Sequence, residues 1–318
     1  MAKYILEFEK PLRDLEEKIE ATKVTALERG IDMSKEIQGL QEKLTKASAD
    51  FYKHLTRWQR VQMARHPQRP YTLDYIQRIT ETWFELHGDR HFRDDKAVIG
   101  GLATIDGNEV MIIGQQKGRG TRDNLYRNFG MPNPEGYRKA LRLVKLAAKF
   151  DRPVISFIDT IGAYPGLGAE ERGQAEAIAR NLMEMATLPV PIIVIVVGEG
   201  ASGGALGMGV GDRLLMLENT WFSVISPEGC ASILYRDTSK AETAADAMKV
   251  APTDLVEMGI CDQVLTEPVG GAHLDVDAVA ATVKKALLEN LQELQKLPRE
   301  DLVAARIKRY DQIGQWQE

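Results

Sequence analysis

Hydrophobic residues recur at helical spacing in the first part of the chain. Between about residues 7 and 66 the sequence is rich in Glu, Lys, Leu and Ala, and its apolar positions lie three or four residues apart, which predicts two amphipathic helices. The positions that share a face are Leu12, Leu15 and Ile19 in the first helix and Ile37, Leu40, Leu44 and Ala47 in the second. Gly30 lies between the helices, and Asp32 or Ser34 can cap the second. We expect a hairpin, or two helices that pack on a partner, closed by a loop at residues 67–70.

From about residue 97 the spacing changes to that of strands. Residues 97–105 and 109–113 are apolar runs on either side of Asp106, Gly107 and Asn108, a strong signal for a β-hairpin. Helical and strand-like segments then alternate. Helices are expected at residues 134–150, 169–186 and 275–297, and strands at residues 153–159, 192–197, 213–217, 221–225 and 262–266. This order predicts an α/β fold with a mostly parallel sheet.

The most informative segment is residues 191–207, PIIVIVVGEGASGGALG. Its first half is continuous and β-branched, as in a strand buried on both faces, and its second half passes through a Gly-rich turn into a helix with Ser202 as the expected N-cap. The free N–H groups at a helix start favour negative charge, and glycines let a ligand approach bare backbone. The turn is therefore a candidate oxyanion hole; a turn that only packs closely is the alternative.

Composition narrows the class of protein. The chain has 318 residues, of which 44% are hydrophobic and 27% charged, with a net charge of −5, an ordinary globular profile. No apolar run reaches the ~20 residues that span a bilayer, and residues 1–10 lack the apolar core of a secretory signal. Cys230 and Cys261 are its only cysteines, too few for a disulfide framework or a four-cysteine zinc site. We expect a cytoplasmic protein whose acidic balance argues against nucleic acid as the main partner.

A long basic loop is expected at residues 114–130. It carries Lys117, Arg119, Arg122 and Arg127 among glycines, with Arg138 nearby. Loops of this length in a compact domain are usually functional, and Arg and Lys form charge-assisted bonds to phosphates and carboxylates. A solvated charge run is one alternative. Contact with RNA is another, but no aromatic platform motif accompanies the loop.

Two other motifs have competing interpretations. His87 and His91 are four residues apart with acidic neighbours, which suggests a metal site, but Gly88 between them favours a loop without metal. Residues 200–204 match the Gly-x-Ser-x-Gly pattern of a hydrolase nucleophile. That chemistry needs a downstream histidine, and His273 is the only one. We therefore favour a capping role for Ser202 over a nucleophilic one.

Several of these stretches together resemble a known family. The stretches are residues 6–12, 114–118, 127–132, 134–142, 159–166, 198–205, 225–231 and 258–262. They are similar to the carboxyltransferase alpha subunits of bacterial-type acetyl-CoA carboxylase, within the crotonase superfamily, and the resemblance covers nearly the whole chain. It implies a crotonase-like ββα-repeat α/β fold with an N-terminal helical extension. We expect a helical segment at 1–34, a CoA carboxyltransferase domain at 35–296 with a helical lead-in to about 80, and a mixed-charge tail at 297–318.

The resemblance also implies the chemistry. Such a subunit helps to transfer a carboxyl group from carboxybiotin to acetyl-CoA, which gives malonyl-CoA for fatty acid synthesis. Charge develops on the biotin ureido oxygen and on the thioester oxygen, so two oxyanion holes and good positioning are needed. The hole for the biotin oxygen is expected from the backbone N–H groups of Gly203 and Gly204, with Gly162 and Ala163 as further candidates in a second loop. The expected substrate-binding residues are Lys117, Arg119, Arg122, Arg127, Tyr164, Gly166 and Ser202, with no metal ligand.

The implied partners complete the site. A beta subunit with a four-cysteine zinc ribbon would supply the second hole, a carrier protein would hold the biotin, and a biotin carboxylase that binds ATP would load it. An α2β2 heterotetramer, without covalent biotin or zinc on this chain, is expected. Two other functions stay open. One is a self-contained crotonase-type hydratase, isomerase or decarboxylase using Glu199, Glu170 or Glu171; the other is an RNA-binding scaffold.

Overall fold

The computed structural model describes residues 4–314. The first three residues of the expected N-terminal segment and the last four of the expected tail lie outside this range. The α-helices, in chain order, are α1 (Lys10–Arg29), α2 (Ser34–Lys53), α3 (Arg57–Ala64), α4 (Thr72–Ile79), α5 (Gly120–Tyr126), α6 (Pro134–Lys149), α7 (Leu167–Glu171), α8 (Gln174–Ala186), α9 (Ser202–Leu206), α10 (Pro227–Tyr235), α11 (Ala241–Met248), α12 (Pro252–Glu257), α13 (Val276–Leu294) and α14 (Arg299–Asp311). Short 3-10 turns lie at Glu7–Glu9, Asn128–Gly130 and Thr238–Lys240.

One eight-stranded sheet forms the centre of the described chain. Its strands are β1 (Thr82–Glu85), β2 (Val98–Ile105), β3 (Asn108–Gln115), β4 (Val154–Thr160), β5 (Ile192–Ala201), β6 (Arg213–Leu217), β7 (Trp221–Ser223) and β8 (Gln263–Leu265). The order is β1-β2-β3-β4-β5-β6-β8, and β7 pairs with the end of β5. β1, β2 and β3 are antiparallel, whereas every pairing from β3 onward is parallel. The predicted α/β class with a mostly parallel sheet is confirmed.

The β2–β3 hairpin has the predicted two-residue turn. Ile105 pairs with Asn108, and both Asp106 and Gly107 have positive φ, 45° and 76°. Two left-handed residues define the type I′ turn, whose twist matches that of paired strands. The hairpin therefore follows from the Asp-Gly pair at the end of an apolar run.

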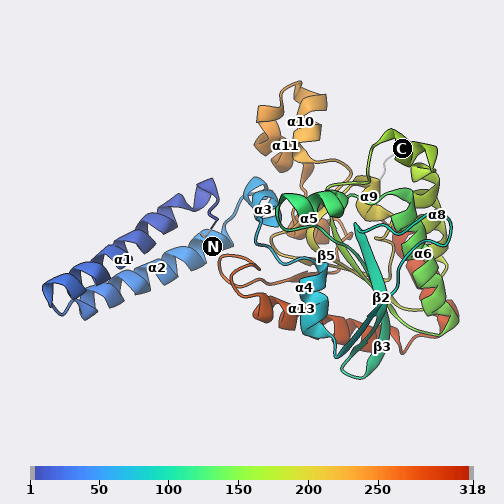
Figure 1. Cartoon of the computed structure of the whole chain (residues 1–318), viewed down its shortest axis with the longest axis horizontal. Helices are drawn as coiled ribbons and strands as arrows, with labels where there is room; N and C mark the ends of the chain where they lie inside the picture. The colour runs from blue at the N-terminus through green and yellow to red at the C-terminus, as the bar shows by residue number, and fades with distance from the viewer. Residues whose placement is uncertain (1–3, 315–318) are drawn as a thin grey trace.

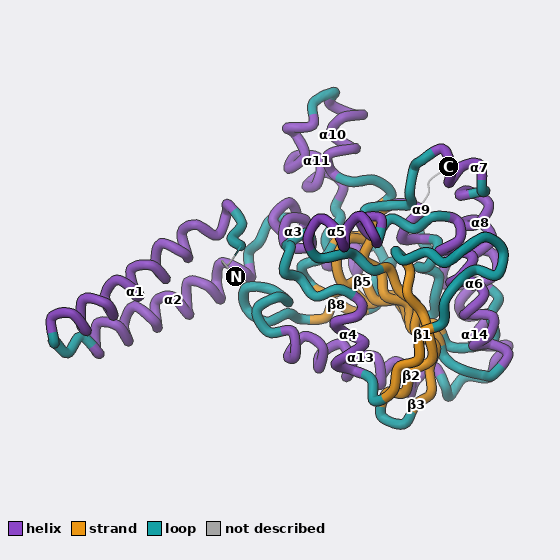
Figure 2. The backbone as a smooth tube through the Cα atoms, in the orientation of Figure 1, coloured by secondary structure: helices purple, strands orange, loops and turns teal. Residues whose placement is uncertain are grey.

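Helices cover both faces of the sheet, so the core has two halves (Figures 1 and 2). One half packs α4 and α13 against residues such as Ile112 and Ile195. The other packs α6 and α8 against their neighbours in the strands, such as Val194. Because β4 and β5 are buried along their full length, continuous apolar runs rather than alternating ones specify them.

Helices α1 and α2 form the predicted hairpin, which projects away from the sheet (Figure 1). Gly30 ends α1 in the left-handed conformation, with φ of 62°, as is common at a helix C-terminus. Asp32 accepts bonds from the N–H and the hydroxyl of Ser34 at the start of α2. The expected domain boundary between residues 34 and 35 thus falls at the start of the second helix of one structural unit.

Three expectations about segments need correction. The single helix expected at residues 169–186 is two helices, because Gly173 adopts a left-handed conformation with φ of 81° between α7 and α8. The expected loop at residues 114–130 contains α5. The described part of the expected tail forms α14, which docks on the body through buried Arg306. Within residues 4–314, no helix combines the length and the apolar character needed to cross a lipid bilayer.

Candidate functional site

The Gly-rich turn lies where β5 passes into α9. β5 continues to Ala201 rather than ending near Gly198, because its last residues, Glu199 to Ala201, pair with β7. Ser202, the next residue, has φ of 62°, so the chain turns sharply from strand to helix. The predicted N-cap role of Ser202 is wrong. Ala201, in an extended conformation, occupies the cap position, and the exposed hydroxyl of Ser202 makes no capping bond.

Buried side chains hold the backbone of α9 and of Gly207, which follows it, by donating hydrogen bonds to carbonyl oxygens. The carbonyl oxygen of Gly204 accepts bonds from Gln115 Nε2 at 3.2 Å and from the Tyr137 hydroxyl at 3.1 Å, and that of Gly207 accepts one from Asn181 at 2.9 Å. The N–H groups of the first helical turn have no intrahelical acceptor. The helix therefore presents the N–H groups of Gly203 and Gly204 in a fixed orientation, at its positive end.

The loop after β4 packs directly against this helix start. A Cβ at Gly204 would lie 2.3 Å from the Ala163 nitrogen and 2.4 Å from the Gly162 carbonyl carbon. Gly162 has φ of 140°, and its N–H donates to the Thr160 hydroxyl at 3.1 Å. The two loops chosen from the sequence thus meet at Gly204, which must be glycine for them to do so. Gly203, in contrast, has only the Ile178 side chain near its Cβ position, at 3.8 Å.

A cavity of about 370 Å³ opens beside Gly203. Ser202 also lines it, and the rest of its wall comes from α9, β7 and the segments around α11 and α12. These wall residues are Leu206, Phe222, Ser223, Val224, Met248, Lys249, Leu255, Met258 and Ile260. The cavity is therefore mostly apolar, with Ser202 and Gly203 at one side.

Tyr164 and Gly166 lie on the loop that follows Gly162. The Tyr164 ring covers Gly166 so closely that a Cβ there would lie 2.4 Å from Cε1 of the ring. Tyr164 lines a second cavity, of about 340 Å³, together with Asp95 and the segment around η2 (Asn128–Gly130). Tyr164 thus faces a different cavity from that beside Gly203, and its ring covers Gly166.

The basic residues of segment 114–130 are not all free to meet a ligand. Arg119 pairs with Asp74 at 2.5 Å and stacks 4.7 Å from the centre of the Tyr71 ring. Arg127 donates to the Lys96 carbonyl at 3.0 Å. Arg122 is exposed. Nearby Arg138 pairs with Asp89 at 2.9 Å.

Lys117 points into the protein instead. Its ammonium contacts Asp159 at 2.7 Å and Glu199 at 2.9 Å, and its side chain is 12% exposed. Glu199 also accepts a bond from Arg65 at 2.7 Å. Sequence reasoning missed this cluster. The available signal was that Asp159 and Glu199 lie near the carboxyl ends of neighbouring parallel strands, whereas nothing local marked Arg65.

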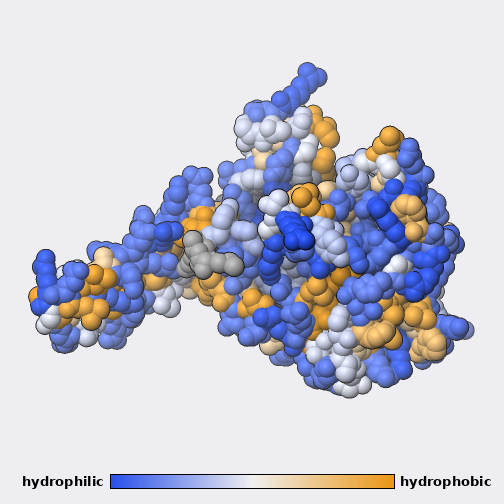
Figure 3. All heavy atoms as spheres, viewed as in Figure 1, coloured by the Kyte–Doolittle hydropathy of each residue, from blue (hydrophilic) through white to orange (hydrophobic). Residues whose placement is uncertain are grey.

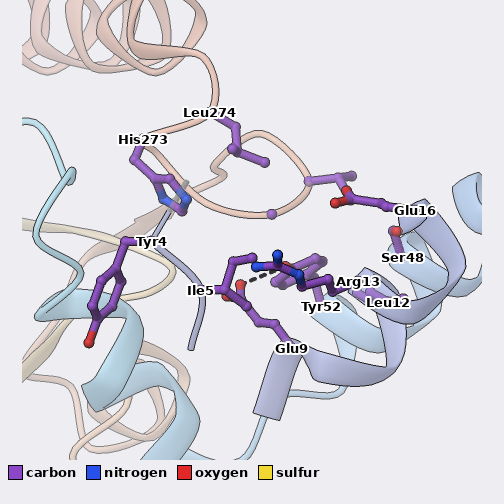
Figure 4. Close-up of a pocket in the computed structure, with 12 residues that line it drawn as sticks. Tyr4, Ile5, Glu9, Leu12, Arg13, Glu16, Ser48, Tyr52, His273 and Leu274 are labelled. Carbon is purple, nitrogen blue, oxygen red and sulfur yellow. Dashed lines mark hydrogen bonds between the residues drawn. The ribbon is translucent and has the colours of Figure 1, made fainter. Parts of the chain in front are cut away.

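His273 and Ser202 line different cavities. His273 stacks on His66 with 3.7 Å between ring centres, and it lines a small cavity at the base of the N-terminal hairpin (Figure 4). The structure therefore does not bring it to Ser202, which lines the cavity beside α9. His87 lies 3.4 Å from Asp94. Among residues 4–314, no group of three or more His, Cys, Asp or Glu side chains is arranged to hold a metal ion.

Comparisons with known proteins agree over nearly the whole chain. A family described as "Acetyl co-enzyme A carboxylase carboxyltransferase-like" matches residues 5–314. The acetyl-coenzyme A carboxylase carboxyl transferase subunit alpha of Chlorobium luteolum is 54% identical, over 98% of this chain and 97% of its own length. The subunit of the same name from a Geobacillus species is 56% identical, over 98% of this chain and 96% of its own.

Solved structures share the fold. A chain of a Pseudomonas malonate decarboxylase hetero-tetramer in complex with coenzyme A superposes with a TM-score of 0.60 at 20% identity, covering 75% of this chain and 94% of that one. Transcarboxylase 12S gives a TM-score of 0.55 at 17% identity, covering 80% of this chain and 44% of that one. The fold is therefore the crotonase-like fold of carboxyltransferases. With the sequence matches, this means that the chain belongs to the family of acetyl-CoA carboxylase carboxyltransferase alpha subunits.

Proposed function

We propose that this alpha subunit supplies one of the two oxyanion-binding sites for carboxyl transfer to acetyl-CoA, through the N–H groups of Gly203 and Gly204. Carboxybiotin, held by a carrier protein, supplies the carboxyl group. The observation that carries the proposal is the left-handed Ser202 between a buried strand and a short helix, which places the start of that helix, at Ser202 and Gly203, in the wall of an apolar cavity. One such donor in a dry site is worth about 3–4 kcal/mol of transition-state stabilisation.

The cavity beside Gly203 fits the biotin group in its chemistry. The fused rings and hydrocarbon arm of biotin are apolar apart from the ureido unit, and the cavity wall is apolar apart from Ser202, Ser223 and Lys249. In such surroundings a hydrogen bond to a charged oxygen is stronger than in water. Gly203 and Ser202 would contact the ureido side, and the apolar wall would exclude water.

Other roles proposed for this chain rest on thinner support. Arg122 is exposed on α5, and Arg119 and Arg127 lie beside it with part of their charge engaged. We assign these arginines, with Tyr164 and Gly166, to contacts with the phosphates or carboxylate of the CoA substrate. This arrangement does not favour an RNA-binding scaffold, because Arg119 and Arg127 are engaged by other residues of the chain.

A self-contained crotonase-type enzyme would need a free acid or base. Glu199 is buried between Lys117 and Arg65. Burial alone raises the pKa of Glu199, but the charges of those two residues outweigh it and hold the pKa below its ordinary value, so this carboxylate remains ionised and engaged. Glu170 and Glu171 are exposed on α7. The geometry thus favours a subunit that positions substrates over one that transfers protons.

The family has partner subunits, and we propose their identities by the same resemblance. A beta subunit with a zinc ribbon would cover the edge of the sheet where the parallel strands end, in an α2β2 assembly in the cytoplasm. Supporting this, exposed apolar side chains follow several of those strands, among them Leu125, Ile161, Leu167, Val224 and Ile233. A biotin carboxyl carrier protein and biotin carboxylase would complete the enzyme.

The proposal is tested by reconstitution. The purified chain, the beta subunit and the mixture are each assayed for carboxyl transfer from malonyl-CoA to biotin, the reverse reaction. We expect activity from the mixture and almost none from either subunit. A beta subunit that is active with another alpha subunit but not with this chain would contradict the function, and full activity of this chain alone would contradict the divided site.

A further inference from the structure

One buried lysine joins the two loops that form the candidate site. Lys117, in the segment after β3, lies 2.7 Å from Asp159 and 2.9 Å from Glu199. Asp159 lies near the end of β4, just before the loop of Gly162 and Ala163, and Glu199 lies near the end of β5, three residues before Ser202. The two carboxylates are 1% and 4% exposed.

The two acidic residues are also joined without the lysine, through close backbone contact. The N–H of Glu199 donates to Asp159 Oδ1 at 3.0 Å. A Cβ at Gly198 would lie 2.3 Å from that same oxygen, and one at Gly130 would lie 2.6 Å from Cγ of Lys117. Glycine at these two positions is therefore what allows the carboxylate and the lysine stem to approach.

Arg65 extends the cluster to a separate part of the fold. It contacts Glu199 at 2.7 Å and forms a two-bond pair with Glu228 in the first turn of α10. Its guanidinium carbon also lies 5.9 Å from the centre of the Trp58 ring and 5.8 Å from that of the Trp221 ring. Two cations, Lys117 and Arg65, thus neutralise three carboxylates. The cluster therefore has no excess positive charge that could bind an anionic substrate.

We propose that Lys117 is a positioning residue for carboxyl transfer: its ammonium holds the loop after β4 and the turn before α9 at the separation that the Gly203 and Gly204 donors require. This rests on the proposed function of those donors. It differs from a substrate-binding role for Lys117, because the ammonium is already shared by two buried carboxylates. Without it, Asp159 and Glu199 would repel each other, and a proton would be drawn to the pair.

The test is Lys117→Met in the reconstituted enzyme. We expect kcat to fall by about 10²–10³-fold, the scale for a misplaced oxyanion donor, with KM nearly unchanged. The remaining kcat should rise as the pH is lowered from about 8 to 6, because a bound proton replaces the lost charge. The double variants with Glu199→Gln or Asp159→Asn should recover part of the loss, as should Lys117→Arg. Lys145→Met, which breaks a surface pair with Glu184, is the matched control and should behave like wild type.

A readout that needs no activity accompanies this assay. In the isolated Lys117→Met chain the pKa of Glu199 should rise, because a charge that lowers it is removed. The variant's deficit in unfolding free energy should therefore be larger at pH 8 than at pH 5.5. A raised KM with wild-type kcat would overturn the proposal and assign Lys117 to substrate binding. A loss of kcat without pH dependence, and without recovery in the double variants, would also overturn it. An inactive wild-type mixture would instead count against the proposed function itself.

Discussion

At the scale of single residues, the site depends on a backbone conformation that side chains rarely favour. Ser202 has φ of 62°, and a non-glycine residue held there costs on the order of 1–3 kcal/mol. The surrounding contacts maintain it: Gly204 is wedged against Gly162 and Ala163, and its carbonyl oxygen is held by Gln115 and Tyr137. Strain maintained in this way at a cavity wall is typical of a functional turn.

A second residue near the candidate site gives a pH-dependent prediction. Burial raises the pKa of Asp95 to about 6, although the N–H groups of Ala97 and Asn133 donate to its carboxylate. In the unfolded chain its pKa is near 3.8. The folded chain therefore binds this proton more tightly, so its stabilising effect is complete below about pH 4 and is lost as the pH rises through about 6. The change is about 3 kcal/mol.

The measurement is chemical unfolding of the wild type and Asp95→Asn between pH 4 and 7. The variant lacks the titrating group, so wild type should lose about 2 kcal/mol of stability relative to the variant over this interval, most of the full effect. Asparagine can also leave one N–H donor unpaired, which lowers stability equally at every pH. A difference between the two proteins that does not change with pH would show that Asp95 titrates normally.

At the scale of elements, a buried arginine helps to attach α14 to the body, together with buried Leu302 and with hydrogen bonds of Arg309 and Tyr310. Arg306 donates to both oxygens of Asp212, at 2.8 and 2.7 Å, and to the carbonyl groups of Met185, Leu188 and Val190. Neither Arg306 nor Asp212 reaches the solvent appreciably. The arginine thus provides hydrogen-bond donors for backbone carbonyl groups between the end of α8 and the start of β5. These bonds hold in place the segment that leads into the central strand.

Arg306→Met tests this attachment. Removing the guanidinium leaves the buried Asp212 carboxylate without its cation, with the N–H of Ile192 as its remaining donor, and takes one donor from each of three carbonyl groups. We therefore expect a loss of about 3–5 kcal/mol in unfolding free energy. Lys308→Met, on the exposed side of the same helix, should change stability by no more than about 0.5 kcal/mol. Urea unfolding of both variants provides the comparison. Equal stability of the Arg306 variant and wild type would mean that the buried arginine contributes little to the attachment of α14.

The same helix shows what sequence patterns can predict here. Strong periodic signals predicted β2, β3, α6, β6 and α13 closely, and Asp275 caps α13 as expected. The sequence predicts a tail where α14 forms, because the helix is mostly polar and the partners of its buried arginine are distant in sequence. At the site, too, the sequence reveals local patterns but not contacts between distant residues. Local glycine patterns led to Gly162, Ala163, Gly203 and Gly204, but the left-handed Ser202 and the Arg65 contact depend on tertiary packing.

At the scale of the whole molecule, the hairpin and the site lie in different parts of the chain (Figure 1). The hairpin carries an apolar tip that faces outward, at Val24, Leu27 and Ile31, and Figure 3 shows apolar residues at its far end. Leu27 is 84% exposed. Two helices with so little buried surface gain stability mainly by packing on something else. Since the proposed site is completed by another subunit, we expect the tip to bind that partner.

Leu27→Glu should therefore weaken assembly without unfolding the chain. We expect the dissociation constant of the alpha and beta subunits to rise about tenfold or more, because a charge would be buried in the interface. The helical circular dichroism should be unchanged. Phe150→Glu, at an exposed apolar position at the end of α6, is the control. Sedimentation analysis that shows wild-type association for the Leu27 variant would exclude the tip from the interface.

The central claim is that backbone N–H groups at the start of α9 stabilise the charge that develops during carboxyl transfer. It is tested most directly by replacing Gly204 with glycolic acid, which exchanges one N–H for an ester oxygen and adds no side chain. In the reconstituted enzyme we expect kcat for carboxyl transfer from malonyl-CoA to biotin to fall by about 10²–10³-fold, with assembly intact. The same exchange at Gly39, in the middle of α2, removes a helical hydrogen bond but should leave kcat unchanged. Wild-type kcat in the assembled Gly204 ester would contradict the claim.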